Sequence, residues 1–451
     1  MGRMFGTDGV RGIANTELTV ELAIKIGRAA AHVLASSKTS KRAKILIGKD
    51  TRVSSDMLQN ALVAGICSYG ADAYVLGTIP TPAVALLVKK YEADAGIMIS
   101  ASHNPVEFNG IKLFNKDGFK LKDSIEDEIE ELVRSGENLY PFITGADLGR
   151  VIYLDKALDD YIDYIAESVS ISDCGLNVVL DCSNGSASAT AEKLFKKLGA
   201  NITLLSAEPD GININKNCGS TNLEPLKAFM KKGGYDIGLA FDGDADRCLA
   251  VDEKGNEVDG DRIIALFAWY LKKEGRLNED TAVVTVMSNL GFFEFADKYG
   301  INAISAKVGD RYVLEKMLEG GYNLGGEQSG HIILSEYATT GDGQMTGAFL
   351  LKILMESGDS LSSLAGIMEK YPQVMRNVTV KNEDKAKLDT DKEIAAVIAE
   401  ASEELKKCGR VLVRASGTEP LIRIMIEGKN LEDIERLADK IASVIEERIE
   451  K

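Results

Sequence analysis

The sequence contains little proline and little cysteine, and each scarcity excludes a class of protein. Only 8 of its 451 residues are proline, against 43 glycines, which argues against a Pro-rich disordered chain and suits many tight turns between strands and helices. The six cysteines are scattered, without a Cys-x-x-Cys pair or histidines at zinc-ligand spacing. The sequence therefore predicts neither a disulfide framework nor a zinc site, and we expect reduced thiols, as in a cytoplasmic protein.

The chain also has no basic cluster and no long hydrophobic run. Its 53 Lys and Arg residues against 69 Asp and Glu residues give a net charge of −16, and no basic run is dense enough to bind nucleic acid or an anionic membrane. The longest strongly apolar run, residues 263–271, is too short for a membrane helix of about 20 residues. Arg3, Asp8 and Arg11 interrupt the segment where a signal peptide would be apolar. We expect a cytoplasmic protein with neither nucleic acid nor membrane as a partner.

One arrangement of elements occurs three times before the final segment. Each time a short β-branched run leads into a turn, a helical stretch follows, and a second apolar run ends in a polar loop. The predicted strands are residues 45–47 and 96–99, residues 178–180 and 237–241, and residues 283–286 and 322–324. Continuous apolar strands that alternate with helices are typical of α/β folds with parallel or mixed sheets. Ligands bind beyond the carboxyl ends of such strands, where the polar loops lie.

The end of the chain follows a different pattern. Residues 411–413 and 421–426 are predicted strands on either side of a polar turn, and an amphipathic helix follows with Asn430 as its N-cap. This arrangement predicts a smaller α+β domain. The length corresponds to about three domains at roughly 150 residues each, and the small final domain raises the expected number to four. We place the domains at residues 1–150, 151–254, 255–370 and 371–451.

Three carboxylates follow one predicted strand at alternate positions: Asp242, Asp244 and Asp246. Such a cluster can hold a hard divalent cation such as Mg²⁺ or Ca²⁺. A solvated acidic turn is the alternative, although apolar residues flank the loop on both sides. An EF-hand loop is excluded, because Arg247 stands where that loop requires glycine and the predicted flanks are strands instead of helices.

The loop Ser-Ala-Ser-His-Asn-Pro, residues 100–105, follows another predicted strand. A polar turn stopped by proline is the simplest interpretation. No hydrolase-type triad spacing or G-x-S-x-G elbow accompanies it, yet a serine can accept and return a phosphoryl group where a metal and cations neutralise the charge. Lys112 lies shortly beyond and could return to the same pocket as a cation or proton carrier, or could be a surface lysine.

Two further loops have the composition of binding sites. Residues 414–420, with Arg423 beyond them, offer two guanidinium groups, two hydroxyls and backbone N–H groups around a glycine, which suits a phosphate monoester. Residues 327–331, Glu-Gln-Ser-Gly-His, supply donors and acceptors for sugar hydroxyls or an amine. Ordinary polar turns remain the alternative for both loops.

Along the chain the order is the serine loop, the aspartate loop, residues 327–331 and residues 414–420. In that order the four loops resemble the α-D-phosphohexomutase superfamily along the whole chain. Within it, several segments are similar to the branch that acts on glucosamine phosphate. These are residues 5–12 (Phe-Gly-Thr-Asp-Gly-Val-Arg-Gly), residues 218–221, residues 308–312 and Gln328. Phosphomannomutase/phosphoglucomutase relatives usually have methionine where Gln328 stands, and Gly-His where Gly309 and Asp310 stand.

The resemblance implies three related α/β/α domains with mixed sheets, and a C-terminal α+β domain of the TATA-binding-protein-like type, around a central cleft. It implies one Mg²⁺ per active site and a phosphoserine at Ser102. The implied catalytic residues are Ser102, His103, Lys112, Arg247 and Arg11; the metal ligands are the phosphate on Ser102 with Asp242, Asp244 and Asp246; the sugar contacts are Glu327 and Ser329; the phosphate contacts are Arg414, Ser416, Gly417, Thr418 and Arg423.

The implied activity is an isomerisation by phosphoryl transfer. Phospho-Ser102 would donate to O1 of glucosamine 6-phosphate, and the bound 1,6-bisphosphate would reorient and return its 6-phosphate, leaving glucosamine 1-phosphate for UDP-N-acetylglucosamine and cell-wall precursor synthesis. Lys112 or Arg247 could assist proton transfer. The alternatives are a phosphomannomutase/phosphoglucomutase, a metal-dependent sugar-phosphate phosphatase and a non-catalytic binding protein. A kinase, autophosphorylation or a bisphosphate primer could first phosphorylate Ser102, and a homodimer is possible.

Overall fold

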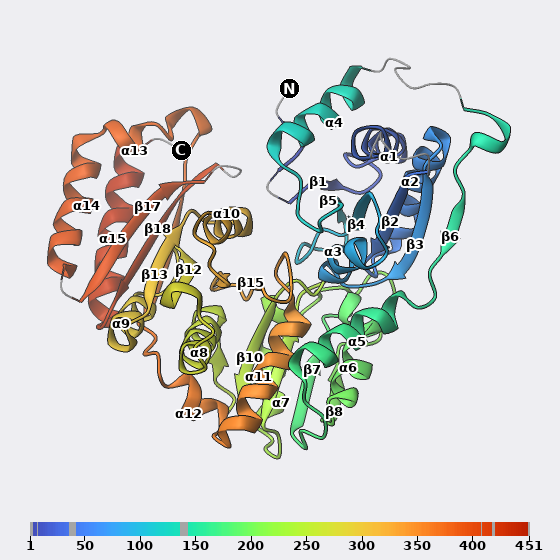
Figure 1. Cartoon of the computed structure of the whole chain (residues 1–451). Helices are drawn as coiled ribbons and strands as arrows, with labels where there is room; N and C mark the ends of the chain where they lie inside the picture. The colour runs from blue at the N-terminus through green and yellow to red at the C-terminus, as the bar shows by residue number, and fades with distance from the viewer. Residues whose placement is uncertain are drawn as a thin grey trace. The chain divides into compact units, whose positions relative to one another are not determined.

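A computed structural model describes residues 3–6, 8–35, 42–135, 143–406, 408–416 and 420–449. The chain forms two compact units (Figure 1). The first comprises Met1–Met287 with Ile301–Gly366, and the second comprises Ser288–Gly300 with Ile367–Lys451. All six cysteines lie in the described ranges and none forms a disulfide, as their spacing predicts. Among the described helices, none is both long enough and apolar enough to cross a bilayer.

The first sheet of the first unit is mixed. Its strand order is β1-β5-β4-β2-β3-β6, in which β2 is parallel to β3 and β4, while β5 is antiparallel to β4 and β1. The strands are β1 (Val10–Ile13), β2 (Lys44–Lys49), β3 (Asp72–Thr78), β4 (Ala95–Ile99), β5 (Phe108–Asn115) and β6 (Val151–Tyr153); the helices are α1 (Val20–Leu34), α2 (Val53–Tyr69), α3 (Thr81–Lys90) and α4 (Asp123–Ser135). Because β6 pairs with β3, this sheet continues past residue 150.

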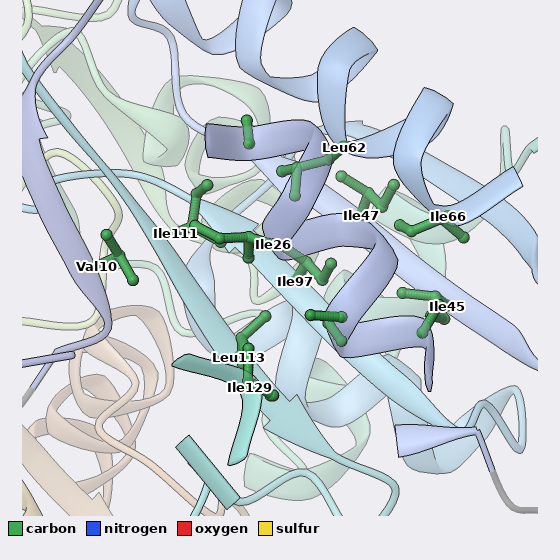
Figure 2. Packing of buried hydrophobic residues seen from close by; sticks show 14 of the residues in the cluster. Val10, Ile26, Ile45, Ile47, Leu62, Ile66, Ile97, Ile111, Leu113 and Ile129 are labelled. Atoms are coloured by element: carbon green, nitrogen blue, oxygen red, sulfur yellow. The ribbon is translucent and has the colours of Figure 1, made fainter. Parts of the chain in front are cut away.

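The core of this sheet is aliphatic. Figure 2 shows Ile26 of α1 and Leu62 of α2 close to Ile97 of β4, and all three side chains are fully buried. The two helices approach closely at Gly27 and Gly65: a Cβ at Gly65 would lie 2.3 Å from the carbonyl oxygen of Ile24. This close packing covers one face of the sheet and leaves its carboxyl-end loops to carry polar residues.

The second and third sheets are also mixed. The second has the order β11-β10-β9-β7-β8 and the third β13-β12-β14-β15. The strands are β7 (Asn177–Asp181), β8 (Asn201–Leu205), β9 (Ile237–Phe241), β10 (Cys248–Asp252), β11 (Glu257–Val258), β12 (Thr281–Thr285), β13 (Asn302–Ala306), β14 (Leu324–Gly326) and β15 (Ile332–Leu334). The helices are α5 (Ala157–Val169), α6 (Ala191–Lys197), α7 (Glu224–Met230), α8 (Gly260–Lys273), α10 (Asp310–Gly320), α11 (Gly343–Ser357) and α12 (Leu361–Ala365).

One strand of the third sheet differs from the prediction. The strand expected at residues 322–324 begins only at Leu324 and includes Gly325 and Gly326, which we expected in the loop. A Cβ at Gly325 would lie 2.6 Å from Sδ of Met317 in α10. The absence of a side chain at Gly325 therefore allows α10 to pack against β14. The prediction placed both glycines in the loop because glycine is typical of turns.

The second unit contains the predicted α+β arrangement. Strands β16 (Gln373–Thr379), β17 (Gly409–Ala415) and β18 (Leu421–Gly428) form an antiparallel sheet in the order β16-β18-β17. Helices α14 (Lys392–Leu405) and α15 (Leu431–Arg448) lie side by side along this sheet (Figure 1), and α9 (Leu290–Tyr299) and α13 (Lys387–Thr390) belong to the same unit. The predicted N-cap is confirmed, because the Asn430 side chain accepts from the N–H of Glu432 at 3.0 Å.

Candidate active site

The serine loop and the aspartate loop meet within the first unit. The serine loop follows β4 and the aspartate loop follows β9, so both leave the carboxyl ends of their strands. Ser102 is buried, and its Oγ donates a hydrogen bond to Oδ2 of Asp242 at 2.6 Å. The φ angle of Ser102 is +52°, in the left-handed region that non-glycine residues seldom adopt. A strained, buried hydroxyl aimed at a carboxylate is a feature of functional sites.

A buried ion pair that the sequence reasoning missed holds the serine loop. Oδ2 of Asp50 accepts from Ser100 Oγ at 2.7 Å and from Arg52 Nε at 2.9 Å. The Arg52 guanidinium then donates to the carbonyl oxygens of Ser102, Asn104 and Pro105 at 3.0, 2.9 and 2.6 Å. Asp50 and Arg52 follow β2, which is parallel to β4. The signal available in the sequence was therefore a charged loop at the same sheet edge.

A second missed contact comes from the segment before α7. Nδ2 of Asn215 donates to the carbonyl oxygens of Ser102 at 2.9 Å and Asn104 at 3.1 Å. The backbone of the serine loop is thus held from two sheets, while the Ser102 hydroxyl remains directed at Asp242.

The three aspartates form a cluster suited to a divalent cation. One ligand oxygen from each of Asp242, Asp244 and Asp246 lies within 4.8 Å of the others, and all three residues are buried. The solvated-turn alternative is therefore wrong. Among the residues that the structure describes, Oδ1 of Asp244 and Oδ1 of Asp246 are buried and have no hydrogen-bond partner. Unsatisfied carboxylate oxygens of this kind fit a hard cation such as Mg²⁺, which prefers oxygen ligands.

The carboxylates of this loop differ in their protonation equilibria. Burial, together with the neighbouring charges of Asp246 and Asp244, raises the pKa of Asp242 well above its usual range. For Asp244, burial acts in the same direction, but the ammonium of Lys112 outweighs it and the pKa is lowered. Lys112 Nζ donates to Oδ2 of Asp244 at 2.6 Å, and the hydroxyl of Thr81 donates to the same oxygen.

Lys112 is a buried cation of the site instead of a surface lysine. Only 1% of its side chain is exposed. Burial lowers its pKa, but the carboxylates of Asp244, Asp8 and Asp246 outweigh that effect and raise it. The ammonium therefore stays protonated at neutral pH, which favours a role as a cation over a role as a proton acceptor.

The segment before β1 adds a further charge network. Arg11 donates to Asp8, and Asp8 also accepts from Lys120 Nζ at 2.5 Å. Lys120 donates in turn to Oδ2 of Asp310 at 2.6 Å. The structure thus brings the expected Arg11 to Lys112 through Asp8, whose carboxylate lies 3.5 Å from Lys112 Nζ. Sequence reasoning gave Asp8, Lys120 and Asp310 no role.

Arg247 contacts the aspartates, and His103 lies beside Ser102. The backbone N–H of Arg247 donates to Oδ1 of Asp242 at 3.2 Å, and its Nε lies 3.9 Å from Oδ1 of Asp246. Nδ1 of His103 is 3.4 Å from Ser102 Oγ. Burial, with the charges of Arg247 and Arg11, lowers the pKa of His103 to about 4, so its imidazole is neutral at neutral pH.

The Glu-Gln-Ser-Gly-His loop joins β14 to β15 beside the aspartate loop. The N–H of Cys248, in the strand after the aspartates, donates to the carbonyl oxygen of Gly330 at 3.0 Å. Glu327 is partly buried and its Oε1 accepts from the N–H of Gly309 at 3.0 Å, while Ser329 is exposed. The loop therefore presents a carboxylate and a hydroxyl near the carboxylate cluster.

His331 ends the same loop, which sequence reasoning assigned as a whole to sugar hydroxyls or an amine without a separate role for the histidine. Its Nε2 lies 3.6 Å from Oδ2 of Asp310 and 4.0 Å from Oδ2 of Asp246. The residue is 2% exposed, and within the described ranges neither ring nitrogen has a hydrogen-bond partner. A buried imidazole between two carboxylates is therefore part of the site.

The expected phosphate-binding residues belong to the second unit. Arg414 of β17 and Arg423 of β18 stand directly opposite each other in the antiparallel pair. Ser416 is buried and its carbonyl oxygen accepts from Lys385 Nζ at 2.6 Å. Gly417 and Thr418 lie outside the described residues. Like charges directly opposite on neighbouring strands are unfavourable, and a bound anion would relieve this repulsion.

Four domain models cover these sheets and loops. They are described as Phosphoglucomutase/phosphomannomutase alpha/beta/alpha domain I, domain II, domain III and C-terminal domain, and they match residues 2–139, 159–255, 259–371 and 375–444. The chain belongs to the phosphoglucomutase/phosphomannomutase family, within the α-D-phosphohexomutase superfamily, as its four loops predicted.

Two relatives are similar to this chain over its full length. The chain is 54% identical to the phosphoglucosamine mutase of Clostridium novyi over 448 residues, 99% of each chain. It is also 54% identical to the phosphoglucosamine mutase of Acetivibrio thermocellus over 449 residues, 100% of each chain.

Solved structures share the fold. A phosphoglucomutase/phosphomannomutase family protein from Burkholderia thailandensis has a TM-score of 0.81 at 26% identity, covering 99% of this chain and 98% of that one. Aspergillus fumigatus N-acetylphosphoglucosamine mutase, solved with GlcNAc-6P and magnesium, has a TM-score of 0.70 at 18% identity, covering 99% and 96%. The predicted fold class, mixed α/β sheets with a C-terminal α+β domain, is confirmed.

Proposed function

We propose that the chain interconverts glucosamine 6-phosphate and glucosamine 1-phosphate through a phosphoserine at position 102. The observation that carries this proposal is the buried Ser102 hydroxyl, 2.6 Å from Asp242 within a cluster of three carboxylates. The full-length identity of 54% to phosphoglucosamine mutases supports the choice of substrate. The reaction is an intramolecular phosphoryl transfer, which makes the protein an isomerase.

The residues around Ser102 can neutralise a transferring phosphoryl group. Lys112, Arg247 and Arg11 are cations in or beside the carboxylate cluster. Enzymes that transfer phosphoryl groups lower the barrier mainly by stabilising the charge of the transition state, and cations supply that stabilisation. Asp242, Asp244 and Asp246 would hold Mg²⁺ together with the phosphate on Ser102, and the ion would supply further charge neutralisation. His103 is neutral and next to the hydroxyl, so it can exchange a hydrogen bond with the serine oxygen without adding charge.

The remaining groups would orient the sugar. Glu327 and Ser329 offer an acceptor and a hydroxyl for sugar contacts. Arg414, Ser416, Gly417, Thr418 and Arg423 would hold the phosphate that is not reacting. The 1,6-bisphosphate has to present first one end and then the other to Ser102, so this phosphate site accepts either phosphate. Positioning of this kind can supply a large part of the rate enhancement.

The cellular setting follows from the substrate chemistry. Glucosamine 1-phosphate is an activated sugar that uridylylation and acetylation would convert to UDP-N-acetylglucosamine for cell-wall precursors in the cytoplasm. Because the enzyme must begin as a phosphoserine, a kinase, autophosphorylation or a bisphosphate primer supplies the first phosphate.

Intact-mass measurement with site mapping on freshly purified protein would find that phosphate on Ser102, and a stable phosphate only at other positions would contradict the assignment.

Replacement of the nucleophile is the first functional test. Ser102→Ala removes the only hydroxyl that the mechanism phosphorylates, so we expect coupled-assay turnover of glucosamine 6-phosphate to fall by at least about three orders of magnitude. Ser135→Ala, on the exposed end of α4, is the matched control and should retain full turnover.

The wild-type assay separates the alternatives. Glucose 6-phosphate or mannose 6-phosphate as the preferred substrate would favour a phosphoglucomutase or phosphomannomutase. Steady release of inorganic phosphate at the turnover rate would favour a phosphatase. Wild-type turnover in Ser102→Ala would contradict the covalent mechanism itself.

A further inference from the structure

Lys112 is shared between two sets of carboxylates. Its Nζ lies 2.6 Å from Oδ2 of Asp244 and 3.5 Å from Oδ2 of Asp246, on the aspartate loop. It also lies 3.5 Å from Oδ2 of Asp8, on the segment before β1. The side chain is 1% exposed, so these carboxylates replace water as its surroundings. The ammonium therefore contacts two of the three carboxylates that would bind a divalent cation, each through its Oδ2 atom.

Asp8 is held in place independently of Lys112. Arg11 donates to Asp8 Oδ2, and Lys120 Nζ lies 2.5 Å from Asp8 Oδ1. Lys120 is fixed in turn by Asp310, 2.6 Å away, and the side chains of Asp8, Lys120 and Asp310 are 20%, 13% and 16% exposed. Asp8 thus keeps its position even when the Lys112 ammonium moves.

A divalent cation and the Lys112 ammonium would compete for Asp244 and Asp246. Two cations at one group of carboxylates repel each other, strongly so where water is excluded. The ammonium can reduce this repulsion by moving toward its third carboxylate, Asp8. A buried ammonium without any such alternative would instead remain on Asp244 and oppose metal binding.

We propose that Asp8 is a positioning residue that receives the Lys112 ammonium when a divalent cation binds the three aspartates. Metal binding and the placement of Lys112 are then coupled, because the cation displaces the ammonium from Asp244 toward Asp8. Lys120 and Asp310 serve this step by keeping the Asp8 carboxylate fixed. The inference rests on the proposed function for its metal site and adds a residue to it.

Metal affinity in a double-mutant cycle tests this coupling. Mg²⁺ binding would be measured by titration calorimetry, and Mn²⁺ binding by electron paramagnetic resonance, on the full chain in a Ser102→Ala background that keeps phosphorylation uniform. Lys112→Met removes the competing ammonium, so affinity should rise about tenfold. Asp8→Asn removes the alternative partner, so affinity should fall about tenfold. The double variant should match Lys112→Met, because Asp8 acts only through Lys112.

Several controls keep the test decisive. Lys197→Met removes an ammonium from an exposed ion pair with Asp163 and should leave metal affinity unchanged. If Asp8→Asn does not fold, Asp8→Asn with Lys120→Met restores the charge balance and replaces it in the cycle. With Ser102 restored and Mg²⁺ saturating, Asp8→Asn should lower kcat while KM stays near wild type, which a general loss of folded protein would not produce.

The outcomes also separate this inference from the proposed function. A weakening by Asp8→Asn that persists in the Lys112→Met background, or no gain of affinity in Lys112→Met, would overturn the inference alone. If the parent protein shows no Mg²⁺ binding that Asp246→Asn weakens, the proposed metal site and this inference are both overturned.

Discussion

Asp50 with Arg52 in the first unit, and Glu427 with Arg410 in the second, are two buried carboxylates that pair with an arginine, and the two pairs hold different parts of the chain. In the first unit the side chains of Asp50 and Arg52 are both 0% exposed, and the remaining guanidinium donors bind carbonyl oxygens of the serine loop. In the second unit Glu427 is 0% exposed, and Arg410, which is 26% exposed, contacts it at 2.7 Å. Glu427 also accepts from Asn289 Nδ2 at 3.2 Å.

The two pairs differ in the part of the chain that each holds in place. Arg52 fixes the backbone of the loop that carries the buried Ser102 hydroxyl. Glu427 and Arg410 instead bind the start of α9, through Asn289, the N–H of Leu290 and the carbonyl oxygen of Ser288. Burial raises the pKa of Glu427, with Arg410 acting against it. Breaking either buried pair is costly, although replacing a whole pair need not be.

The largest effect is expected from Arg52→Met. The change leaves Asp50 buried without its cation and frees three carbonyl oxygens of the serine loop, so stability should fall by about 3–5 kcal/mol. Turnover of glucosamine 6-phosphate should fall at least about a hundredfold, since the serine is no longer held in position. Urea unfolding and the coupled assay on the folded protein measure the two effects. Wild-type turnover in a folded Arg52→Met protein would remove the distinction between the two pairs.

Arg410→Met should give the second largest effect, and on stability alone. It leaves Glu427 buried beside Asn289, which should cost about 3 kcal/mol. Turnover per folded molecule should stay within about threefold of wild type, because the pair joins segments of the second unit and touches no reacting group. The same two assays apply. A loss of turnover as large as that of Arg52→Met would mean that both pairs serve the reaction directly.

The contrast also explains what the sequence could predict. The strand–loop pattern predicted β4, β9 and their polar loops correctly, because buried parallel strands have continuous apolar runs and place functional residues at one edge. The final two strands and the helix after them were predicted from their local apolar pattern, together with the Asn430 cap. Local pattern is enough where each residue's environment is set by its neighbours in sequence.

Long-range ion pairs carry no such local signal. Arg52 contacts the carbonyl oxygens of Ser102 and Asn104, about fifty residues away, and nothing in Asp-Thr-Arg indicates that partner. Asp8 likewise stood in a recognised segment, but its bonds to Lys120 and its proximity to Lys112 depend on how β1 and β5 pair. The location of the site was therefore predictable from strand ends, while the residues that hold it in place required the structure.

The smallest effect on stability is expected at Asp342. In the part of the chain that the structure describes, this buried carboxyl has no cationic partner. It is the N-cap of α11, where it accepts from the N–H of Met345 and from the hydroxyl of Tyr161, both at 2.9 Å. Burial outweighs these bonds and raises its pKa from 3.8 to about 6.

This pKa makes stability depend on pH in a defined direction. Between pH 4 and 6 the folded state binds more protons at Asp342 than the unfolded state does, so ionisation of this group lowers stability as pH rises through that window, by about 2 kcal/mol in total. Asp342→Asn keeps an N-cap acceptor but cannot ionise. Relative to wild type, the variant should therefore gain stability between pH 4.5 and 7.5 in urea unfolding. A difference between the two proteins that does not change with pH would show that Asp342 is neutralised by a partner, as Asp50 and Glu427 are.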